Sequence, residues 1–445
     1  MLAARLVKMV KTAPVAAALT LILVLAAGQA QAATKLVFMG WSGHLEREIY
    51  ESVIQQFERE HPGVEVDVQY VDPADFTNRL VSMIAAGTAP DVFYVPLDRF
   101  ADWAAAGGVL LDLVPYAEKD RELPLKTIWP MGINLYRFDG QRVGRGNQLL
   151  AMPKDLGPWA MVYNADLYDE AGVKAPPADK PLLWPEAVSL WRKLTRDKNG
   201  DGTPDVWGMA GWPLGFPVEG AIWSNGADYL SPDLTRVTVD TPEFTEAVQW
   251  VANLSLVEKV ATPPLSDNWN WWLQGKIATF YMGPWDQAFF WNNLKFRWDI
   301  APWPASPRTK ESRTWLGSMG IGVAANTKNP QLAYELVKYL TMDKEAQAKL
   351  YELGQMVPNR IDLLPEFVKM NKPPFNRKVF IDIITTYGRV HPWYYTTDDT
   401  WWNVLTQEIL PDIYTGKALA AQVLPGQIKR LQSLFAKNLG QSTGR

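Results

Sequence analysis

The N-terminal part of the chain switches repeatedly between strand and helix patterns, and this alternation restricts the fold more than any other feature. Strand patterns at 35–41, 64–71 and 90–95 are separated by amphipathic helix patterns at 46–60 and 73–86. A strand–helix–strand–helix–strand order predicts a parallel sheet with helices on both faces. In such sheets ligands bind beyond the carboxyl ends of the strands.

The ends of these strands indicate where a ligand site is expected. The first strand pattern ends at Trp41, and Asp98 and Arg99 follow the third. A second α/β unit begins near Met152 with another strand pattern, and a helix pattern follows at 185–195. Because the sequence shows no internal repeat and no low-complexity linker, we expect two lobes joined by crossing strands.

The N-terminus has the pattern of a secretory signal peptide. Basic residues precede an apolar run at 15–27, and Ala30 and Ala32 occupy the small-x-small positions of a cleavage site. The run is shorter than the roughly 20 residues that a membrane-spanning helix needs. We therefore expect residues 1–32 to be a signal peptide, cleaved after Ala32, and the mature chain to be exported, most simply to a periplasm.

Charge and composition exclude several classes of function. The chain has 44 Lys and Arg against 48 Asp and Glu, with no basic block, so neither nucleic acid nor an anionic membrane is expected as a partner. It has no Cys and three His, which do not share metal-ligand spacing. The segment "GSMGIG" at 317–322 lacks the companion residues of a phosphate loop. No cofactor is expected to be required.

Tryptophan is concentrated in one stretch, 269–291, which holds five of the 21 in the chain. An indole joins a large apolar face to one N–H donor, so it suits surfaces that are partly apolar and partly wetted. A groove lined by such side chains is expected to bind a ligand of the same mixed character. Elsewhere tryptophans are more often packing residues, and Trp191, Trp250 and Trp298 are assigned to cores.

Four segments carry a resemblance to a known family. They are "KLVFMGW" (35–41), "IAAGTAPDVFYV" (84–95), "AMPKDLGPWAMVYNADLY" (151–168) and "ATFYMGPW" (278–285). Their order and spacing resemble the extracellular sugar-binding proteins of ABC importers, the maltodextrin-binding-like group. The resemblance implies an α/β chain with a two-lobed periplasmic binding protein fold, a hinge and an interlobe ligand cleft. It also implies a monomeric receptor that is not an enzyme and that delivers a sugar to a membrane permease.

The family builds each lobe from discontinuous segments. By this resemblance, lobe 1 is expected at 33–150 and about 285–330. Lobe 2 is expected at about 151–284 and 331–445, with a helical carboxyl-terminal part.

The resemblance also implies which residues contact the ligand. Asp98 and Arg99 match a pair that hydrogen-bonds sugar hydroxyls, and Trp285 matches a tryptophan that stacks on a sugar ring. A second stacking tryptophan matches Trp402, with Trp401 one register away, and an aromatic cleft position falls at Phe216. At Gly157 the chain lacks the family's acidic contact, which argues against maltose itself. With Trp41 from the strand-end argument, the expected ligand-binding residues are Trp41, Asp98, Arg99, Phe216, Trp285 and Trp402.

The segment "DKNGDGTPD" at 197–205 resembles part of a calcium loop. Side-chain oxygens recur at positions 1, 3, 5 and 9, a carbonyl is available at position 7, and Gly202 stands at the sharp turn. Position 12 is Gly208, where a bidentate Glu is wanted. A structural calcium ion and a plain Asn-Gly/Asp-Gly turn both remain open. The possible ligands are Asp197, Asn199, Asp201, Thr203 and Asp205.

Two other functions compete with sugar binding. A glycoside hydrolase would need two carboxylates about 5–10 Å apart, which 48 acidic residues do not forbid. A ferric-ion receptor would need hard ligands, and "HPWYYTTDD" offers His391, Tyr394 and Tyr395 beside carboxylates. The family resemblance favours the sugar receptor over both.

Overall fold

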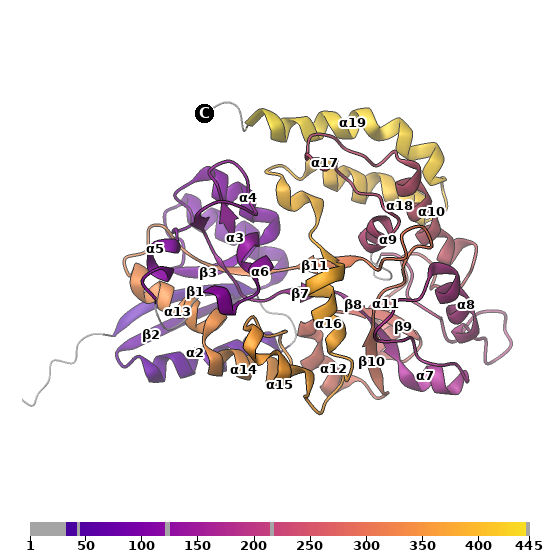
Figure 1. Cartoon of the computed structure of the whole chain (residues 1–445), viewed down its shortest axis with the longest axis horizontal. Coiled ribbons are helices and arrows are strands. Elements are labelled where there is room, and N and C mark those ends of the chain that lie inside the picture. Colours follow the sequence, from indigo (N-terminus) through magenta and orange to yellow (C-terminus); the bar gives the residue numbers. More distant parts are fainter. Residues whose placement is uncertain (1–32, 42–44, 121–124, 214–217, 442–445) are drawn as a thin grey trace, which may run out of the picture.

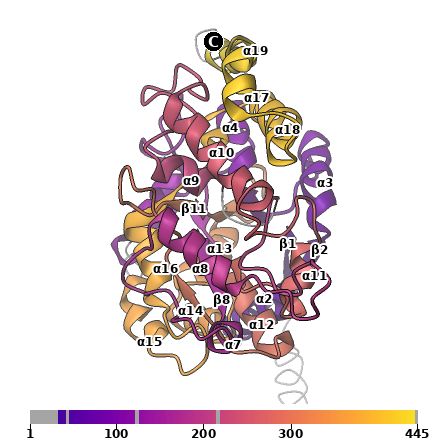
Figure 2. The same cartoon turned by 90° about the vertical axis from the view of Figure 1, so that its right-hand side faces the viewer.

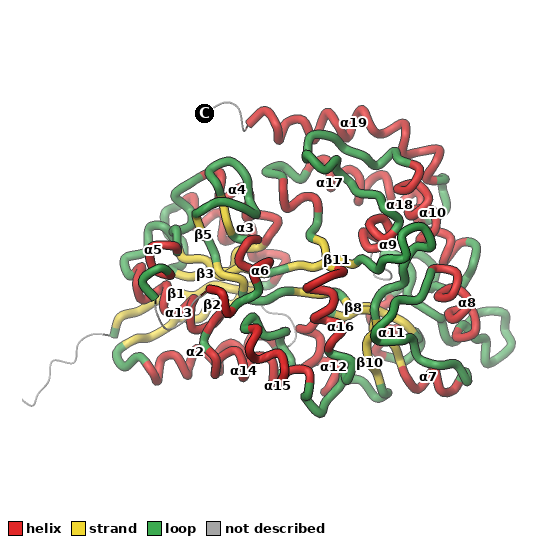
Figure 3. Tube along the Cα trace, viewed as in Figure 1, coloured by secondary structure: helices red, strands yellow, loops and turns green. Residues whose placement is uncertain are grey.

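The computed structural model describes residues 33–41, 45–120, 125–213 and 218–441, and it shows two lobes lying side by side (Figure 1). The expected signal peptide, 1–32, lies outside the described residues. Helices form most of the outside of both lobes, and strands lie within them (Figure 3). In the described part of the chain, no helix combines the length and apolarity needed to cross a bilayer.

The first lobe is built on a five-stranded sheet of order β2-β1-β3-β12-β6. The strands are β1 (Thr34–Trp41), β2 (Val64–Val71), β3 (Val92–Pro96), β6 (Met152–Pro153) and β12 (Met319–Val323). β1 is parallel to β2 and β3, whereas β12 is antiparallel to β3 and β6. The parallel part agrees with the alternation of strand and helix patterns, and it places the ends of β1 and β3 at one edge.

Helices pack against this sheet, and in the view of Figure 2 the second lobe lies in front of it. They are α2 (Glu46–Glu60), α3 (Pro73–Ala85), α4 (Leu97–Ala106), α5 (Val114–Ala117), α6 (Pro130–Leu135), α13 (Pro330–Met342), α14 (Lys344–Glu352) and α15 (Leu364–Val368). α2 buries Ile49, Val53 and Phe57, the face that its four-residue spacing predicts. A short hairpin of β4 (Arg137–Phe138) and β5 (Gln148–Leu149) completes the lobe.

The second lobe contains an antiparallel sheet of order β10-β8-β9. Its strands are β8 (Ala160–Asn164), β9 (Thr279–Met282) and β10 (Trp298–Ala301), and its helices are α7 (Ala165–Glu170), α8 (Trp184–Leu194), α9 (Val218–Ser224), α10 (Pro242–Leu256), α11 (Asn268–Leu273), α12 (Gln287–Asn293), α17 (Thr400–Asn403), α18 (Leu410–Tyr414) and α19 (Ala420–Gln441). Side chains alternate along β8. Ala160 and Val162 join the hydrophobic core that reaches into the first lobe, whereas Met161 and Tyr163 join the second core.

Three short strands connect the lobes. β7 (Gly157–Pro158), β11 (Thr314–Gly317) and β13 (Gly388–Arg389) form a sheet of order β13-β11-β7 at the centre of the molecule (Figure 1). β7 leads from β6 into β8, β11 leads back into β12, and β13 follows α16 (Lys378–Asp382) on the third crossing. Because the crossing segments are paired strands, they form a hinge rather than a loose tether.

Two segments pack with the lobe opposite to the expected one. β10, inside the 285–330 segment expected in lobe 1, pairs with β8 of the second lobe. α13, inside the 331–445 segment expected in lobe 2, contacts β12 and α2 of the first lobe. The expected boundaries at about 285 and 331 are therefore wrong. The chain changes lobes at β11 and β13 instead. The pattern of an amphipathic element shows that one face is buried, but not which sheet covers it.

Most of the tryptophan-rich stretch packs inside the protein. Trp272 has no exposed surface and stacks on Phe280, with ring centroids 5.6 Å apart. Trp291 donates from its indole nitrogen to the Pro373 carbonyl at 2.6 Å. Some tryptophans of this stretch therefore pack in the core, whereas Trp285 lies beside Trp315 of the hinge strand β11. The tryptophans assigned to cores are packed as expected: Trp191, Trp250 and Trp298.

Candidate functional site

Two cavities lie back to back beside the hinge, and the segment 388–397 separates them. His391 lines a cavity of about 170 Å³, whereas its neighbours Val390 and Pro392 line one of about 1830 Å³. Tyr229 lines the smaller cavity, and Asp228 and Leu230 line the larger. The two cavities differ in size and in the chemistry of their lining.

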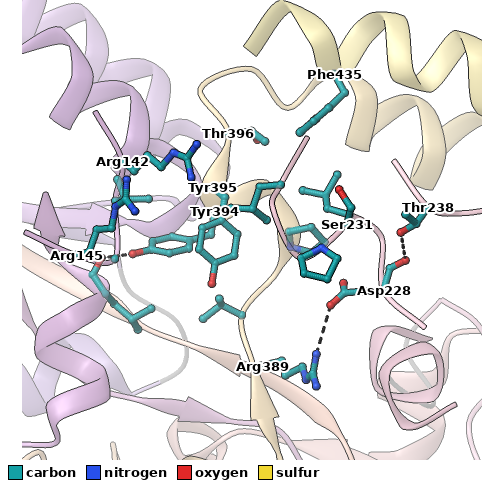
Figure 4. A pocket seen from close by; sticks show the side chains of 18 of the residues that line it. Arg142, Arg145, Asp228, Ser231, Thr238, Arg389, Tyr394, Tyr395, Thr396 and Phe435 are labelled. Atoms are coloured by element: carbon teal, nitrogen blue, oxygen red, sulfur yellow. Dashed lines mark hydrogen bonds and ion pairs between the residues drawn. The ribbon is translucent and has the colours of Figure 1, made fainter. Parts of the chain in front are cut away.

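The larger cavity spans both lobes, and many of its polar groups bond to protein groups. Arg389 Nη1 lies 3.3 Å from Asp228 Oδ2 (Figure 4). Thr238 Oγ1 donates to the Asp228 carbonyl at 2.7 Å, and the Tyr394 hydroxyl donates to the Leu135 carbonyl. None of the described side chains that line this cavity has a buried polar atom without a partner. The polar groups that line the larger cavity therefore bond to one another or are accessible from the cavity.

The smaller cavity is surrounded by aromatic rings from several segments. Trp159 meets Trp315 edge-on at 5.0 Å, and the Trp315 ring lies 5.3 Å from the His391 ring. Trp159 directly follows β7 and Trp315 belongs to β11, so the hinge strands position both indoles. The cavity is lined by Trp159, Trp212, Pro213, Val218, Glu219, Tyr229, Trp315, His391, Thr406, Leu410 and Tyr414.

Three buried polar atoms at the smaller cavity have no hydrogen-bond partner among the described residues. They are Trp159 Nε1, His391 Nδ1 and Tyr414 Oη. Tyr414 is only 1% exposed. Buried polar groups are almost always hydrogen-bonded, because leaving one unsatisfied costs about 1–3 kcal/mol. The three atoms are buried within the cavity wall, and the indole nitrogens of Trp184 and Trp272 are buried without partners elsewhere in the described residues, so the three atoms do not by themselves indicate a ligand.

Glu219 and His391 approach each other at this cavity without forming an ion pair. His391 Nδ1 lies 3.7 Å from Glu219 Oε1, which exceeds hydrogen-bonding distance. Burial lowers the pKa of His391 to about 3, so its ring is neutral near pH 7. Burial also raises the pKa of the Glu219 carboxyl. The two residues thus bring a carboxyl group and a neutral ring to the lining of the smaller cavity.

Trp285, expected to stack on the ligand, lies next to this cavity. Its ring centroid is 6.4 Å from that of Trp315. The turn that carries it is closed by a hydrogen bond of 2.9 Å from the Gly283 nitrogen to Asp286 Oδ2. A Cβ added to Gly157 would lie 2.7 Å from the Trp285 ring. The indole therefore leaves no room for a side chain at Gly157, where the resemblance would place an acidic contact.

Trp402 also contacts the lining of the smaller cavity. Its ring lies 5.6 Å from that of His391 and 4.9 Å from that of Tyr229. Trp401 has no exposed surface and packs edge-on against Phe435 in the second core. Of the two adjacent tryptophans, Trp402 is thus the one that faces the cavity side of α17.

The structure does not bring Asp98 and Arg99 to the smaller cavity. Both lie at the start of α4, as expected from the end of β3, but neither lines the cavity. Arg99 Nη1 lies 3.6 Å from Asp102 Oδ2. Burial, together with nearby Asp399 of the second lobe, raises the pKa of Asp102 to about 6 against the opposing effect of Arg99. These groups therefore lie where the two lobes face each other.

The two remaining expected contacts have different outcomes. Trp41 packs edge-on against Phe76 and Tyr94 in the first lobe, with centroids 5.0 and 6.0 Å away, and lines neither cavity. Phe216 lies outside the described residues. In the sequence it stands between Pro213 and Val218, which both line the smaller cavity.

The segment 197–205 forms a turn held by its own backbone. The Asp197 carboxylate accepts hydrogen bonds from the nitrogens of Gly200 and Gly202 at 2.7 and 2.8 Å. The Asp205 carboxylate accepts one from the Lys198 nitrogen at 2.7 Å. No group of three or more His, Cys, Asp or Glu side chains in the described residues is placed to hold a metal. The residues do not form a complete calcium site, and bound calcium stays a prediction.

The expected iron ligands do not converge. His391 lines the smaller cavity, whereas Tyr394 and Tyr395 line the larger one. The Tyr394 hydroxyl is already bonded to the Leu135 carbonyl. Burial raises the pKa of Tyr395, which opposes the tyrosinate form that ferric iron would need. This arrangement argues against the ferric-ion receptor.

Sequence reasoning missed several groups that surround the cavity. Trp159 directly follows β7 and Trp315 belongs to β11, and the sequence analysis assigned neither of them a role. Glu219 and Tyr414 lie on short helices, α9 and α18, and carry no motif. The Tyr414 hydroxyl has no hydrogen-bond partner among the described residues, and the Glu219 carboxyl lies 3.7 Å from the neutral His391 ring. Both properties arise only in the folded chain.

Comparison with known proteins gives relatives of one kind. An arabinooligosaccharide-binding protein of Halalkalibacterium halodurans is 23% identical over 346 residues, which cover 75% of this chain and 73% of the relative. A maltodextrin-binding protein of Bacillus subtilis is 25% identical over 331 residues, which cover 70% of each chain.

Solved structures share the fold over almost the whole chain. An ABC substrate-binding protein of Listeria monocytogenes in complex with cycloalternan has a TM-score of 0.76 and 24% identity, with 92% of this chain and 99% of that chain covered. A maltose/maltodextrin-binding domain of Bdellovibrio bacteriovorus bound to maltotriose has a TM-score of 0.73 and 21% identity, covering 91% and 100%. The two-lobed α/β fold is thereby confirmed.

A family model matches residues 42–347, which is more than half of the chain. That model describes the bacterial extracellular solute-binding proteins. Two lobes joined by crossing strands, with a cavity lined by aromatic and polar side chains beside the hinge, agree with this family. The chain belongs to the family of bacterial extracellular solute-binding proteins.

Proposed function

We propose that the protein captures a carbohydrate at the smaller cavity and at the neighbouring Trp285 and Trp402. It then delivers the carbohydrate to the permease of an ABC importer. A sugar ring has C–H-rich faces that lie against indoles and a rim of hydroxyls that both donate and accept hydrogen bonds. The observation that carries this proposal is the cavity beside the hinge that Trp159, Trp315 and His391 line with neighbouring aromatic rings.

The names of the relatives support the same class of ligand. They include receptors for arabinooligosaccharides and maltodextrins, and the similar structures hold cycloalternan and maltotriose. Since these sugars differ in ring type and linkage, they favour carbohydrate as a class without selecting one sugar. The Trp285 ring packed over Gly157 separates this chain from the family pattern and disfavours maltose itself.

The remaining parts of the proposal concern where and how the receptor works. The mature protein is exported to a periplasm after cleavage behind Ala32, and it acts there as a monomer. It binds its sugar without cleaving it. Incubation with end-labelled oligosaccharides should therefore give no shorter products, and size-exclusion chromatography with light scattering should give the mass of one chain.

A thermal-shift screen tests the carbohydrate proposal. A ligand that binds only the folded protein raises the melting temperature by mass action. Mono-, di- and trisaccharides of glucose, arabinose, galactose and xylose are compared with amino acids and ferric citrate under the same conditions. At least one sugar should raise the melting temperature, and calorimetry should confirm its binding. A response to amino acids or iron alone would refute the proposal.

A further inference from the structure

The turn that carries Trp285 is built from buried polar side chains. Trp285 itself is half-buried, whereas Asp286 and Gln287, which follow it, are 3% and 0% exposed. Carboxyl and amide side chains are rarely buried this deeply, because an apolar side chain of similar size can be buried there without the cost of desolvating a polar group. Their presence directly after the tryptophan therefore needs a structural reason.

Both side chains bond to the backbone of the turn, and these bonds lie on either side of Trp285. Asp286 Oδ2 accepts a hydrogen bond from the Gly283 nitrogen at 2.9 Å, and Gln287 Nε2 donates one to the Pro284 carbonyl at 2.8 Å. The backbone nitrogen of Gln287 donates to the same carbonyl. The two buried side chains thus fix the backbone directly before and after the indole.

The turn places the indole against backbone that only glycine leaves open. A Cβ added to Gly157 of β7 would lie 2.7 Å from the Trp285 ring, and one added to Gly283 would lie 2.3 Å from it. The Trp315 ring of β11 stands edge-on to the indole, with centroids 6.4 Å apart. The ring therefore packs on the hinge strands, and a change in the turn would move it from this place.

We propose that Gln287 and Asp286 are positioning residues, which hold Trp285 in its ligand-binding orientation before the ligand arrives. Neither side chain has enough exposed surface to contact a ligand itself. A receptor whose stacking ring is already oriented loses no binding free energy to ordering that ring. This inference rests on the proposed carbohydrate function, although the orientation of the ring can be measured without ligand.

A conservative change at Gln287 separates orientation from stability. Gln287→Met keeps the approximate size of the side chain and removes the donor to the Pro284 carbonyl. Gln287 Oε1 has no hydrogen-bond partner among the described residues, so the variant also removes a buried polar atom that costs stability. Because the two effects oppose each other, the melting temperature should change little.

Fluorine NMR of protein labelled with fluorotryptophan measures the orientation of the ring. The Trp285 resonance is identified by its loss in Trp285→Phe. In ligand-free protein, Gln287→Met should shift or broaden this resonance. The resonance of Trp191, which packs in the second core, should stay unchanged.

Calorimetry with the tightest sugar from the thermal-shift screen measures the consequence for binding. Gln287→Met should weaken binding roughly 2- to 10-fold, the range over which one neutral hydrogen bond shifts an equilibrium between ring orientations. Gln347→Met is the matched control, because Gln347 is also 0% exposed but bonds to the Leu340 carbonyl and the Asn359 nitrogen, at 2.8 Å each. The control should lower the melting temperature and leave both the sugar affinity and the Trp285 resonance unchanged.

Two variants of Asp286 test the other bond of the turn. Asp286→Asn keeps an oxygen that can accept from the Gly283 nitrogen, whereas Asp286→Leu removes it. Asp286→Leu should therefore shift the Trp285 resonance and weaken sugar binding. Asp286→Asn should restore most of the affinity that Asp286→Leu loses.

The outcomes separate this inference from the proposed function. If sugars bind but Gln287→Met leaves the Trp285 resonance unchanged, the side chain does not orient the ring and the inference is overturned. A shifted resonance with unchanged affinity also overturns it, since the orientation would then not matter for capture, while carbohydrate binding stands. If no sugar in the screen binds the wild type, the proposed function fails, and this inference fails with it.

Discussion

The carboxyl group of Asp286 should make the stability of the fold depend on pH. Asp286 is 3% exposed, follows Trp285 directly and accepts the hydrogen bond from Gly283 that closes the turn. Burial raises the pKa of Asp286 to about 7, whereas an unfolded aspartate titrates near about 3.9. Because the folded state holds the proton more tightly, this group stabilises the fold at low pH and loses that contribution as pH rises through about 7.

The size of the effect follows from the two pKa values. A difference of about three units, at ~1.36 kcal/mol per unit, corresponds to about 4 kcal/mol of unfolding free energy. Asp286→Asn keeps an oxygen that accepts from the Gly283 nitrogen but cannot ionise. The variant should therefore match the wild type near about pH 4 and exceed its stability by up to about 4 kcal/mol near about pH 8.

Urea denaturation of both proteins at a series of pH values measures the effect. Other groups with raised pKa values, among them Glu219 and Asp102, titrate in both proteins and cancel in the difference. The difference in unfolding free energy should grow steadily between about pH 4 and pH 7 and then level off. A difference that stays constant with pH would mean that Asp286 ionises normally and that burial does not raise its pKa.

Further variants and measurements test the site, the hinge and the calcium loop. Trp285→Ala should weaken sugar binding roughly 30- to 1,000-fold in calorimetry, because a stacked aromatic contact is worth about 2–4 kcal/mol; normal affinity would contradict its placement at the ligand. Trp191→Ala, at a residue 1% exposed, should instead lower the unfolding free energy by about 3–5 kcal/mol and leave the affinity of the folded fraction unchanged. Small-angle scattering should show a smaller radius of gyration with bound sugar, since contacts to both lobes favour closure; equal radii at saturation would count against hinge motion. If calcium binds at 197–205, a chelator should lower the melting temperature of the wild type but not of Asp197→Ala/Asp201→Ala; an equal response would identify the segment as a plain turn.

The first lobe could be predicted in part because local periodicity determines its elements. The spacing of Ile49, Val53 and Phe57 identifies the buried face of α2, and strict alternation identifies β2. The placement of α13 could not be predicted in the same way. Its apolar face is visible in the sequence, but β12 and α2, which it contacts, are distant from each other along the chain. Only the topology of the sheet brings them together.

The site was predictable where a residue type itself carries the information. Trp285 was expected from "MGPW" and Trp402 from "TWWNVL", and the ring of each lies beside a ring of the cavity lining; their contact with a ligand stays a prediction. Asp98 follows its strand as expected but does not line the cavity. Glu219 and Tyr414 could not be identified, since a carboxylate and a tyrosine on short helices are common. Both residues line the smaller cavity only because the fold brings α9 and α18 to the hinge, which the sequence does not show.

The chain crosses between the lobes three times, through β7, β11 and β13. Since three is odd, the two ends of the described chain lie on different lobes, with β1 in the first and α19 in the second (Figure 1). A hinge motion that moves α19 toward or away from β1 then changes the separation of the ends. A donor dye attached before Thr34 and an acceptor dye on α19 would report ligand capture by energy transfer, with no label in the cavity. The topology therefore allows ligand capture to be followed with two dyes attached outside the cavity.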